Sequence, residues 1–260
     1  MNCQVSFDEP THIYTNTKTS EKYESVTTII GKYKNKFETE RIAKEYVVNH
    51  PELGFKNWKE VVALWDDIRD TALVKGNIYH NTQELQSLLA ESNLNADYND
   101  HVKDLKTLPD GVYPELRIYN HKYKKAGTVD KVIIETIDNI RWVDIKDYKT
   151  NKHPLGYQGF KGQTMLGPLS YLQDASYSHY SLQMCIYGYF LEQFGYKVRS
   201  LELIHKRYLN EESIPESEFI PFESREDQLR KFLVPKHVPV KYLPLRIKSL
   251  LEYDKHLIAA

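Results

Sequence analysis

The spacing of apolar side chains changes along this chain, and in its first third the spacing is helical. Apolar residues recur at helical intervals over 36–50, and from Trp58 they recur every three or four residues through Leu73 and on to Leu89. These patterns predict one helix over 36–50 and a longer helix that begins at Trp58. Gly76 lies inside the longer helix, where glycine costs about 1 kcal/mol relative to alanine. It therefore indicates either a break or a place where another segment comes close.

From Val112 onward the pattern becomes the alternation of β-strands. Predicted strands cover 112–121, 128–135, 140–150 and 197–209, with turns around Lys124–Gly127 and at Asp138-Asn139. Residues 1–30 contain short β-prone runs around a polar turn, and residues 92–111 and 151–178 are predicted as loops, the second with room for one short helix. Further helices are predicted over 179–195, where Gly195 provides a stop, and near 223–233 and 243–258.

This order of elements predicts an α/β fold, in which a mixed central β-sheet is flanked by helices. The chain shows neither an internal repeat nor a low-complexity linker, so we expect a single domain over 1–260. Within it, 1–75 form an N-terminal β and helical elaboration, 76–210 the core, and 211–260 a helical extension.

Composition narrows the classes of protein that this chain can represent. It has 260 residues, of which 41% are hydrophobic, and a net charge of −1, which excludes a histone-like positive coat. No stretch approaches the roughly 20 apolar residues of a membrane span, and the N-terminus lacks the layout of a signal peptide. The two cysteines cannot supply a four-thiolate iron–sulfur or zinc site. They also suggest a reducing compartment, so we expect a cytoplasmic protein, in the host cytoplasm if a phage encodes it.

Two aspartates are predicted to face each other across the second β-hairpin. A turn at Asp138-Asn139 places Asp130 opposite Asp147, with Cβ atoms about 5 Å apart. Lys149 shares the face of Asp147, because side chains alternate along a strand. Like charges at this distance repel, and a divalent cation bound by oxygen ligands would offset the repulsion.

The same spacing fits a salt-bridged surface hairpin equally well. Asp144 and Lys146 repeat the pattern on the opposite face, and we expect them to face solvent. Two helical pairs four residues apart, His80 with Glu84 and Gln183 with Tyr187, each project from one face of a helix. Taken alone, the first pair fits a structural histidine and the second fits core packing.

Taken in order along the chain, these fragments resemble the PD-(D/E)XK nuclease superfamily. The matching fragments are Gly76-x-x-x-His80, Glu115, Gly127-Thr128-Val129-Asp130, Asp147-Tyr148-Lys149-Thr150 and Gln183-x-x-x-Tyr187. They are most similar to its RecB-like exonuclease branch, which includes phage exonucleases and the mitochondrial genome maintenance exonuclease. The resemblance implies a restriction-endonuclease-like sheet.

The resemblance also implies roles for individual residues. Asp130 and Asp147 would hold Mg²⁺ or Mn²⁺ together with His80 and the Tyr148 carbonyl. Lys149 would orient or activate the attacking water and stabilise the negative charge that develops on the phosphate.

Further residues would serve catalysis or substrate binding. Glu115 would assist a second metal or the lysine, and Gln183 and Tyr187 would position DNA or the acidic strand. Thr150, which follows the lysine in the fourth motif, is a further substrate-binding candidate. Lys125 belongs to a short basic run before Asp130 that fits phosphate contacts and a solvated charge run equally well.

The expected activity is therefore a Mg²⁺- or Mn²⁺-dependent DNA exonuclease that prefers single strands or free ends, in phage-type replication, recombination or repair. Its expected partner is DNA, together with replication or recombination proteins. The alternatives are a structure-specific endonuclease of the same fold, or a DNA-binding protein that kept the fold without catalysis. A third is an unrelated α/β enzyme, which no nucleotide-binding glycine motif supports.

Overall fold

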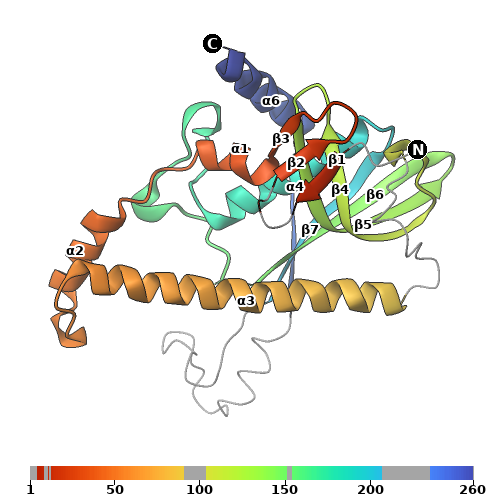
Figure 1. The fold of residues 1–260 in the computed structure, drawn as a ribbon. Coiled ribbons are helices and arrows are strands. Elements are labelled where there is room, and N and C mark those ends of the chain that lie inside the picture. Colours follow the sequence, from red (N-terminus) through yellow and green to blue (C-terminus); the bar gives the residue numbers. More distant parts are fainter. Residues whose placement is uncertain are drawn as a thin grey trace.

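The chain folds around one β-sheet with helices on its faces and along one end (Figure 1). The structure is a computed structural model that describes residues 5–8, 11, 13–90, 104–150, 154–206 and 235–259. The strands are β1 (Val5–Asp8), β2 (Ile13–Asn16), β3 (Lys22–Ser25), β4 (Gly111–Asn120), β5 (Lys125–Ile137), β6 (Ile140–Lys149), β7 (Lys197–His205) and β8 (Lys236–Pro239). The α-helices are α1 (Val26–Lys32), α2 (Thr39–Asn49), α3 (Trp58–Ala90), α4 (Ser176–Glu192) and α6 (Pro244–Ala259).

Within the described residues, eight strands form a single mixed sheet. The order is β1-β2-β3-β5-β6-β7-β8, with β4 paired to β5 outside this path. β3 runs parallel to β5 and β6 runs parallel to β7, while the other pairs are antiparallel. The predicted mixed α/β fold with an N-terminal elaboration is thereby confirmed.

One edge of β5 is paired with a neighbouring strand along most of its length, whereas the other edge has an unpaired stretch that leaves a gap in the sheet. β4 occupies one edge along most of its length, from Lys125 to Ile134. On the other edge β3 pairs only with Lys125 and Ala126, and β6 pairs only from Lys131 onward. Residues 127–130 thus have no strand partner on that edge among the described pairings. Side chains from other elements can therefore reach them.

The helices close the faces and one end of the sheet. α4 is buried along most of its length and packs against β7 and β4 on one side and against α6 on the other. α3 runs along one end of the sheet, as Figure 1 shows, and contacts β4. None of the described helices has a stretch long and apolar enough to cross a membrane.

The long helix predicted from Trp58 continues unbroken through Gly76. The reason for a glycine there is the approach of a neighbour, because a Cβ at this position would lie 3.2 Å from Thr150 Oγ1. α3 is thus brought close to the end of β6. The prediction of either a break or a close approach is resolved in favour of the approach.

Two local predictions differ from the structure. The β-prone run after Ser25 forms α1, because the Ser25 side chain accepts a hydrogen bond from Thr28 N–H and the helix buries Val26, Ile29 and Ile30. The first hairpin turn lies at 121–124, before the predicted position, because β5 begins at Lys125. The predicted helix near 223–233 lies outside the described residues.

Candidate metal centre

Three carboxylates lie at the same level on three adjoining strands. The β5–β6 register pairs Lys131 with Lys146, as the Asp138-Asn139 turn predicts, so Asp130 and Asp147 are the next facing positions. The β4–β5 register likewise brings Glu115 level with Asp130, because the pairs on either side of them follow one register. A row of acids across adjoining strands concentrates negative charge in one place.

The backbone of Glu115 departs from strand geometry. Its φ is +49°, in the left-handed region that non-glycine residues rarely adopt. Such a conformation costs on the order of 1 kcal/mol or more and tends to occur at functional sites. Here it interrupts the pairing with Asp130 that the register would otherwise make, so that Glu115 turns toward the acid row.

α3 contributes a histidine to this row. His80 Nδ1 lies 3.4 Å from Asp130 Oδ2, and Tyr148 N–H donates a 2.6 Å hydrogen bond to the same oxygen. One ligand atom from each of His80, Glu115 and Asp130 lies within 4.8 Å of the others. These three residues therefore form a candidate metal-binding triad.

Asp147 and Lys149 complete the cluster from β6. The Asp147 side chain is fully buried, and its Oδ2 forms a 2.5 Å ion pair with Lys149 Nζ. Its other oxygen, Oδ1, has no hydrogen-bond partner among the described residues. Lys149 Nζ also lies 4.8 Å from the centre of the Tyr180 ring, a cation–π arrangement. A buried carboxylate oxygen without a donor is costly unless a cation or water satisfies it.

The protonation of the cluster reflects its shortage of positive charge. Burial, with Asp130 adding to it, raises the pKa of Glu115 to about 8. Burial also raises the pKa of Asp147 to about 6, against the opposing effect of Lys149. By contrast, the pKa of Asp130 is lowered despite burial, because His80, Lys149 and the Tyr148 N–H all favour its charged form.

Neighbouring acids raise the pKa values of both Lys149 and His80. Burial would lower the pKa of Lys149, but Asp147 and Asp130 outweigh it and raise that pKa. The same balance, with Asp130 as the main partner, raises the pKa of His80. Lys149 is therefore an ammonium near neutral pH, suited to stabilising negative charge rather than to accepting a proton.

The donor set fits a divalent cation. Oxygen ligands from Glu115 and Asp130 suit Mg²⁺ or Mn²⁺, and the imidazole of His80 is compatible with Mn²⁺. The unsatisfied oxygen of Asp147 adds a further acceptor beside them.

The triad opens into a cavity of about 730 Å³ in the gap along β5. Gln183 and Tyr187 of α4 line it, and the Gln183 side-chain amide donates a 2.8 Å hydrogen bond to the Tyr187 hydroxyl. A Cβ at Gly127 would lie 2.6 Å from the Tyr187 ring, so only glycine leaves room for this ring. The helical pair predicted from its spacing thus lies beside the acids.

The other two predicted substrate contacts occupy different places. Thr150 lines a smaller cavity of about 320 Å³, which His80 and Lys149 also border. Lys125 lies in a separate cavity and is only 1% exposed. A substrate contact at either residue stays a prediction.

The expectation that Asp144 faces solvent is wrong. Asp144 is 8% exposed, and it accepts hydrogen bonds from the Arg199 guanidinium and from the Ser200 hydroxyl at 2.5 Å. β7 pairs along the free edge of β6, so its side chains Arg199 and Ser200 lie beside Asp144. The sequence of the hairpin alone does not show which strand adjoins β6. Arg199 and Ser200 lower the pKa of Asp144 against the opposing effect of burial.

Several polar residues of the large cavity were not identified from the sequence. They are Asn77 and Asn81 of α3, Thr128 of β5 and Arg117 of β4. Arg117 follows Glu115 by two residues, and strand alternation would have placed both on one face. Asn77 lies three residues before His80 and four before Asn81, and this helical spacing was a second signal.

Comparison with known proteins returned little. No protein-family model matches the chain, and no curated protein matches it. Among solved structures it is similar to a crystal structure of a "putative exonuclease" from Eubacterium rectale, with 11% sequence identity and a TM-score of 0.31. That similarity covers 91% of this chain and 79% of the other. It is a distant likeness between two structures.

Proposed function

We propose that this protein is a metal-dependent nuclease that hydrolyses the phosphodiester bonds of DNA, acting from free ends or on single strands. The observation that carries the proposal is the acid row Glu115, Asp130 and Asp147, with His80 and one buried ammonium at its edge. Three acids, one of them fully buried and paired with the only lysine of the cluster, make an unfavourable arrangement in the absence of further positive charge. They suit a divalent cation and a phosphate group together.

Each group then has a chemical role. Glu115, Asp130 and His80 would hold the cation, with Asp147 available beside them. When bound, the cation lowers the pKa of a ligated water and polarises a phosphoryl oxygen. Lys149, held as an ammonium by Asp147, stabilises the charge that accumulates on the phosphate.

The cavity suits an extended polar substrate. Its walls present Arg117, Asn77 and Gln183, which can donate hydrogen bonds to phosphate or base oxygens. Phe7 and Tyr14, stacked with ring centres 4.5 Å apart, line the same cavity. Aromatic faces of this kind accept the stacking of unpaired bases, which supports a single-stranded substrate.

A digestion series tests the proposal. We expect purified protein with Mg²⁺ or Mn²⁺ to degrade end-labelled linear single-stranded DNA and to release no product in EDTA. Circular single-stranded DNA should resist, since it has no end; rapid cutting of circles would instead assign an endonuclease.

Two variants test whether the hydrolysis depends on the proposed site. Asp147→Asn and Lys149→Met should abolish hydrolysis while both proteins keep the circular dichroism spectrum of the wild type. If both variants retained wild-type rates, the nuclease assignment would be wrong. If the wild type bound DNA but never cleaved it with any divalent ion, the chain would be a DNA-binding protein.

A further inference from the structure

A second cavity, of about 650 Å³, lies beside the candidate metal centre, and half of the residues that line it are lysines. It is formed by β2, β3, α1, the turn at 121–124, the start of β5, and α6. The lysines are Lys22, Lys32, Lys122, Lys124, Lys125 and Lys255, and the one acid in the lining is Glu24. Such a concentration of ammonium groups indicates an anionic ligand.

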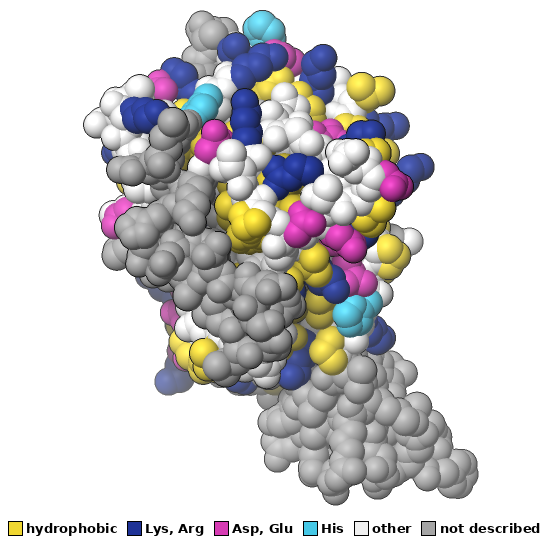
Figure 2. All heavy atoms as spheres, turned by 90° about the vertical axis from the view of Figure 1, so that its right-hand side faces the viewer, with side chains coloured by type: hydrophobic (Ala, Val, Ile, Leu, Met, Phe, Trp, Pro, Cys, Tyr) yellow, Lys and Arg dark blue, Asp and Glu magenta, His cyan; other side chains and the backbone are white. Residues whose placement is uncertain are grey.

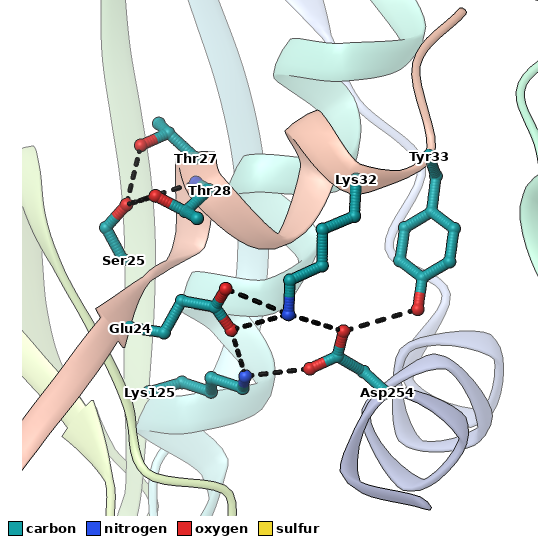
Figure 3. A network of polar contacts seen from close by, with 8 residues as sticks. All are labelled: Glu24, Ser25, Thr27, Thr28, Lys32, Tyr33, Lys125 and Asp254. Carbon is teal, nitrogen blue, oxygen red and sulfur yellow. Dashed lines mark hydrogen bonds and ion pairs between the residues drawn. The ribbon is translucent and has the colours of Figure 1, made fainter. Parts of the chain in front are cut away.

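The lysine cavity adjoins the metal-centre cavity at a single residue. Ser25 lines both of them, at the junction of β3 and α1. Its hydroxyl contacts Thr27 Oγ1 at 2.9 Å and Thr28 Oγ1 at 2.8 Å, so the shared wall is polar (Figure 3). A chain of phosphates that passes over Ser25 would therefore leave the acid row and meet the lysines.

The floor of the lysine cavity is an ion-pair network that balances its own charge. Lys125 bridges Glu24 and Asp254, and Lys32 contacts the same two carboxylates at 2.8 and 3.0 Å (Figure 3). Tyr33 adds a 3.3 Å hydrogen bond to Asp254. Two ammonium groups and two carboxylates saturate one another here, so the floor offers shape and little net charge.

The rim of the lysine cavity holds the charge that a ligand can use. Lys124 pairs with Glu21 at 2.5 Å and Lys122 pairs with Glu252, and all four side chains are at least one-third exposed. Exposed pairs of this kind contribute little and exchange readily for a phosphate. Lys22 and Lys255 are exposed and form no ion pair with any described residue.

The surface agrees with a local concentration of this kind. Lys and Arg side chains gather toward the top of the face drawn in Figure 2, the end of the molecule where Figure 1 places α6. Elsewhere on that face the two signs of charge are interspersed. Because the net charge of the chain is −1, nonspecific attraction by the whole protein is weak, and a polyanion must be held locally.

We propose that the lysine cavity is a second nucleic-acid subsite, which binds the backbone phosphates of the strand whose scissile bond lies at the acid row. This inference rests on the proposed nuclease function. If the subsite exists, tight binding requires a strand of a minimum length. A strand long enough to span both cavities gains the lysine contacts, whereas a dinucleotide reaches only the metal centre.

Binding without metal tests the subsite separately from catalysis. The variant is Lys22→Ala with Lys255→Ala, and the matched control is Lys106→Ala with Lys197→Ala, two exposed lysines outside the cavity. In EDTA, fluorescence anisotropy with single-stranded DNA of about 20 nucleotides should show Kd raised about tenfold in the variant. Its slope of log K against log salt should fall by about 0.7 for each lost phosphate contact. The control should match the wild type.

Hydrolysis of substrates of two lengths completes the test. For the longer strand, the variant should raise KM about tenfold and leave kcat near the wild-type value. For a dinucleotide, kcat/KM should be the same in the variant, the control and the wild type. Inorganic tripolyphosphate should compete only weakly with the long strand; if it competed at equal affinity, the ligand would be a free polyphosphate.

The outcomes distinguish a failure of the lysine subsite from a failure of the proposed nuclease function. A variant that binds the long strand with wild-type affinity and salt slope overturns the subsite, whatever the activity. A wild type that hydrolyses no nucleic acid overturns the nuclease proposal, and with it the role of the lysines in catalysis. Thermal unfolding should show the same midpoint in all three proteins, because the four side chains are exposed.

Discussion

Two charge clusters in this protein each contain a fully buried aspartate, and they differ in how its charge is balanced. The network under the lysine cavity sets Glu24 and Asp254 against Lys32 and Lys125, and each carboxylate meets both ammonium groups. The candidate metal centre sets three carboxylates against one lysine and one histidine, and Asp147 Oδ1 has no hydrogen-bond partner within the part of the chain that the structure describes.

The protonation states follow this difference. In the network, the two lysines lower the pKa of Asp254 against the opposing effect of burial. In the metal centre, burial and neighbouring acids raise the pKa of Glu115 to about 8. Removing one partner from a balanced cluster leaves a buried charge without its counter-ion, whereas an unbalanced cluster is retained at a cost and is typical of functional sites.

The largest effect should come from removing an acid of the metal centre. Asp130→Asn should lower kcat by about 10³-fold or more, because it removes a shared ligand of the cation. The free energy of unfolding of the metal-free protein should fall by a smaller factor, because His80, Lys149 and the Tyr148 N–H lose the charge that they stabilise. Steady-state kinetics with Mg²⁺ and urea denaturation measure the two quantities. A large loss of stability with retained activity would make the acid row structural.

Removing an acid from the balanced network should lower stability and leave catalysis unchanged. Asp254→Ala leaves Lys125 buried without one of its two carboxylates and should cost about 3–5 kcal/mol of stability. Urea unfolding measures the loss, and the double variant Lys125→Met, Asp254→Leu should recover much of it. Hydrolysis of a dinucleotide by the folded fraction should be unchanged. If Asp254→Ala left the free energy of unfolding unchanged, the ion pairs of the network would not contribute to stability.

Divalent ions should stabilise only the unbalanced cluster. At about 100 times its Kd, Mn²⁺ should add about 2.7 kcal/mol to the free energy of unfolding, because only the folded protein presents the triad. The Asp130→Asn variant should lose this stabilisation. The variant Asp144→Asn, from the opposite face of β6, should keep it, although its own stability falls. Equal stabilisation of all three would place the ion elsewhere.

The pH dependence of stability should differ in sign between the clusters. The folded pKa of Glu115 is raised from 4.5 to about 8, so the folded protein holds the extra proton between these values. Stability of the metal-free protein should therefore fall as pH rises through this window, by up to about 1.4 kcal/mol per pH unit for one proton. Urea unfolding at several pH values in EDTA measures the slope, and Glu115→Gln should reduce it.

The ion-pair network should affect the pH dependence of stability only at acid pH. The pKa of Asp254 is lowered from 3.8, so its contribution to stability is present above that value and is lost as pH falls through the folded pKa. The variant Asp254→Asn should flatten the acid limb of the stability profile and leave the alkaline slope unchanged. A variant that changed both limbs would mean that the clusters are coupled.

Much of the candidate metal centre could be predicted from the sequence, because the relative placement of its residues depends on local periodicity. The turn at Asp138-Asn139 and the alternation of the strands placed Asp130 opposite Asp147 and put Lys149 on the same face. The helical period placed His80 on α3 and paired Gln183 with Tyr187 on α4. Register within a hairpin and faces of a helix follow from spacing alone.

Contacts between segments far apart in the chain required the tertiary structure. The left-handed backbone of Glu115, the burial of Asp144 against Arg199, and the meeting of Lys125 with Asp254 have no local sequence signal. Each depends on which strand or helix lies alongside, and the packing of the whole core decides this. The sequence by itself determined which residues share a face, and the tertiary structure decided which charges are balanced.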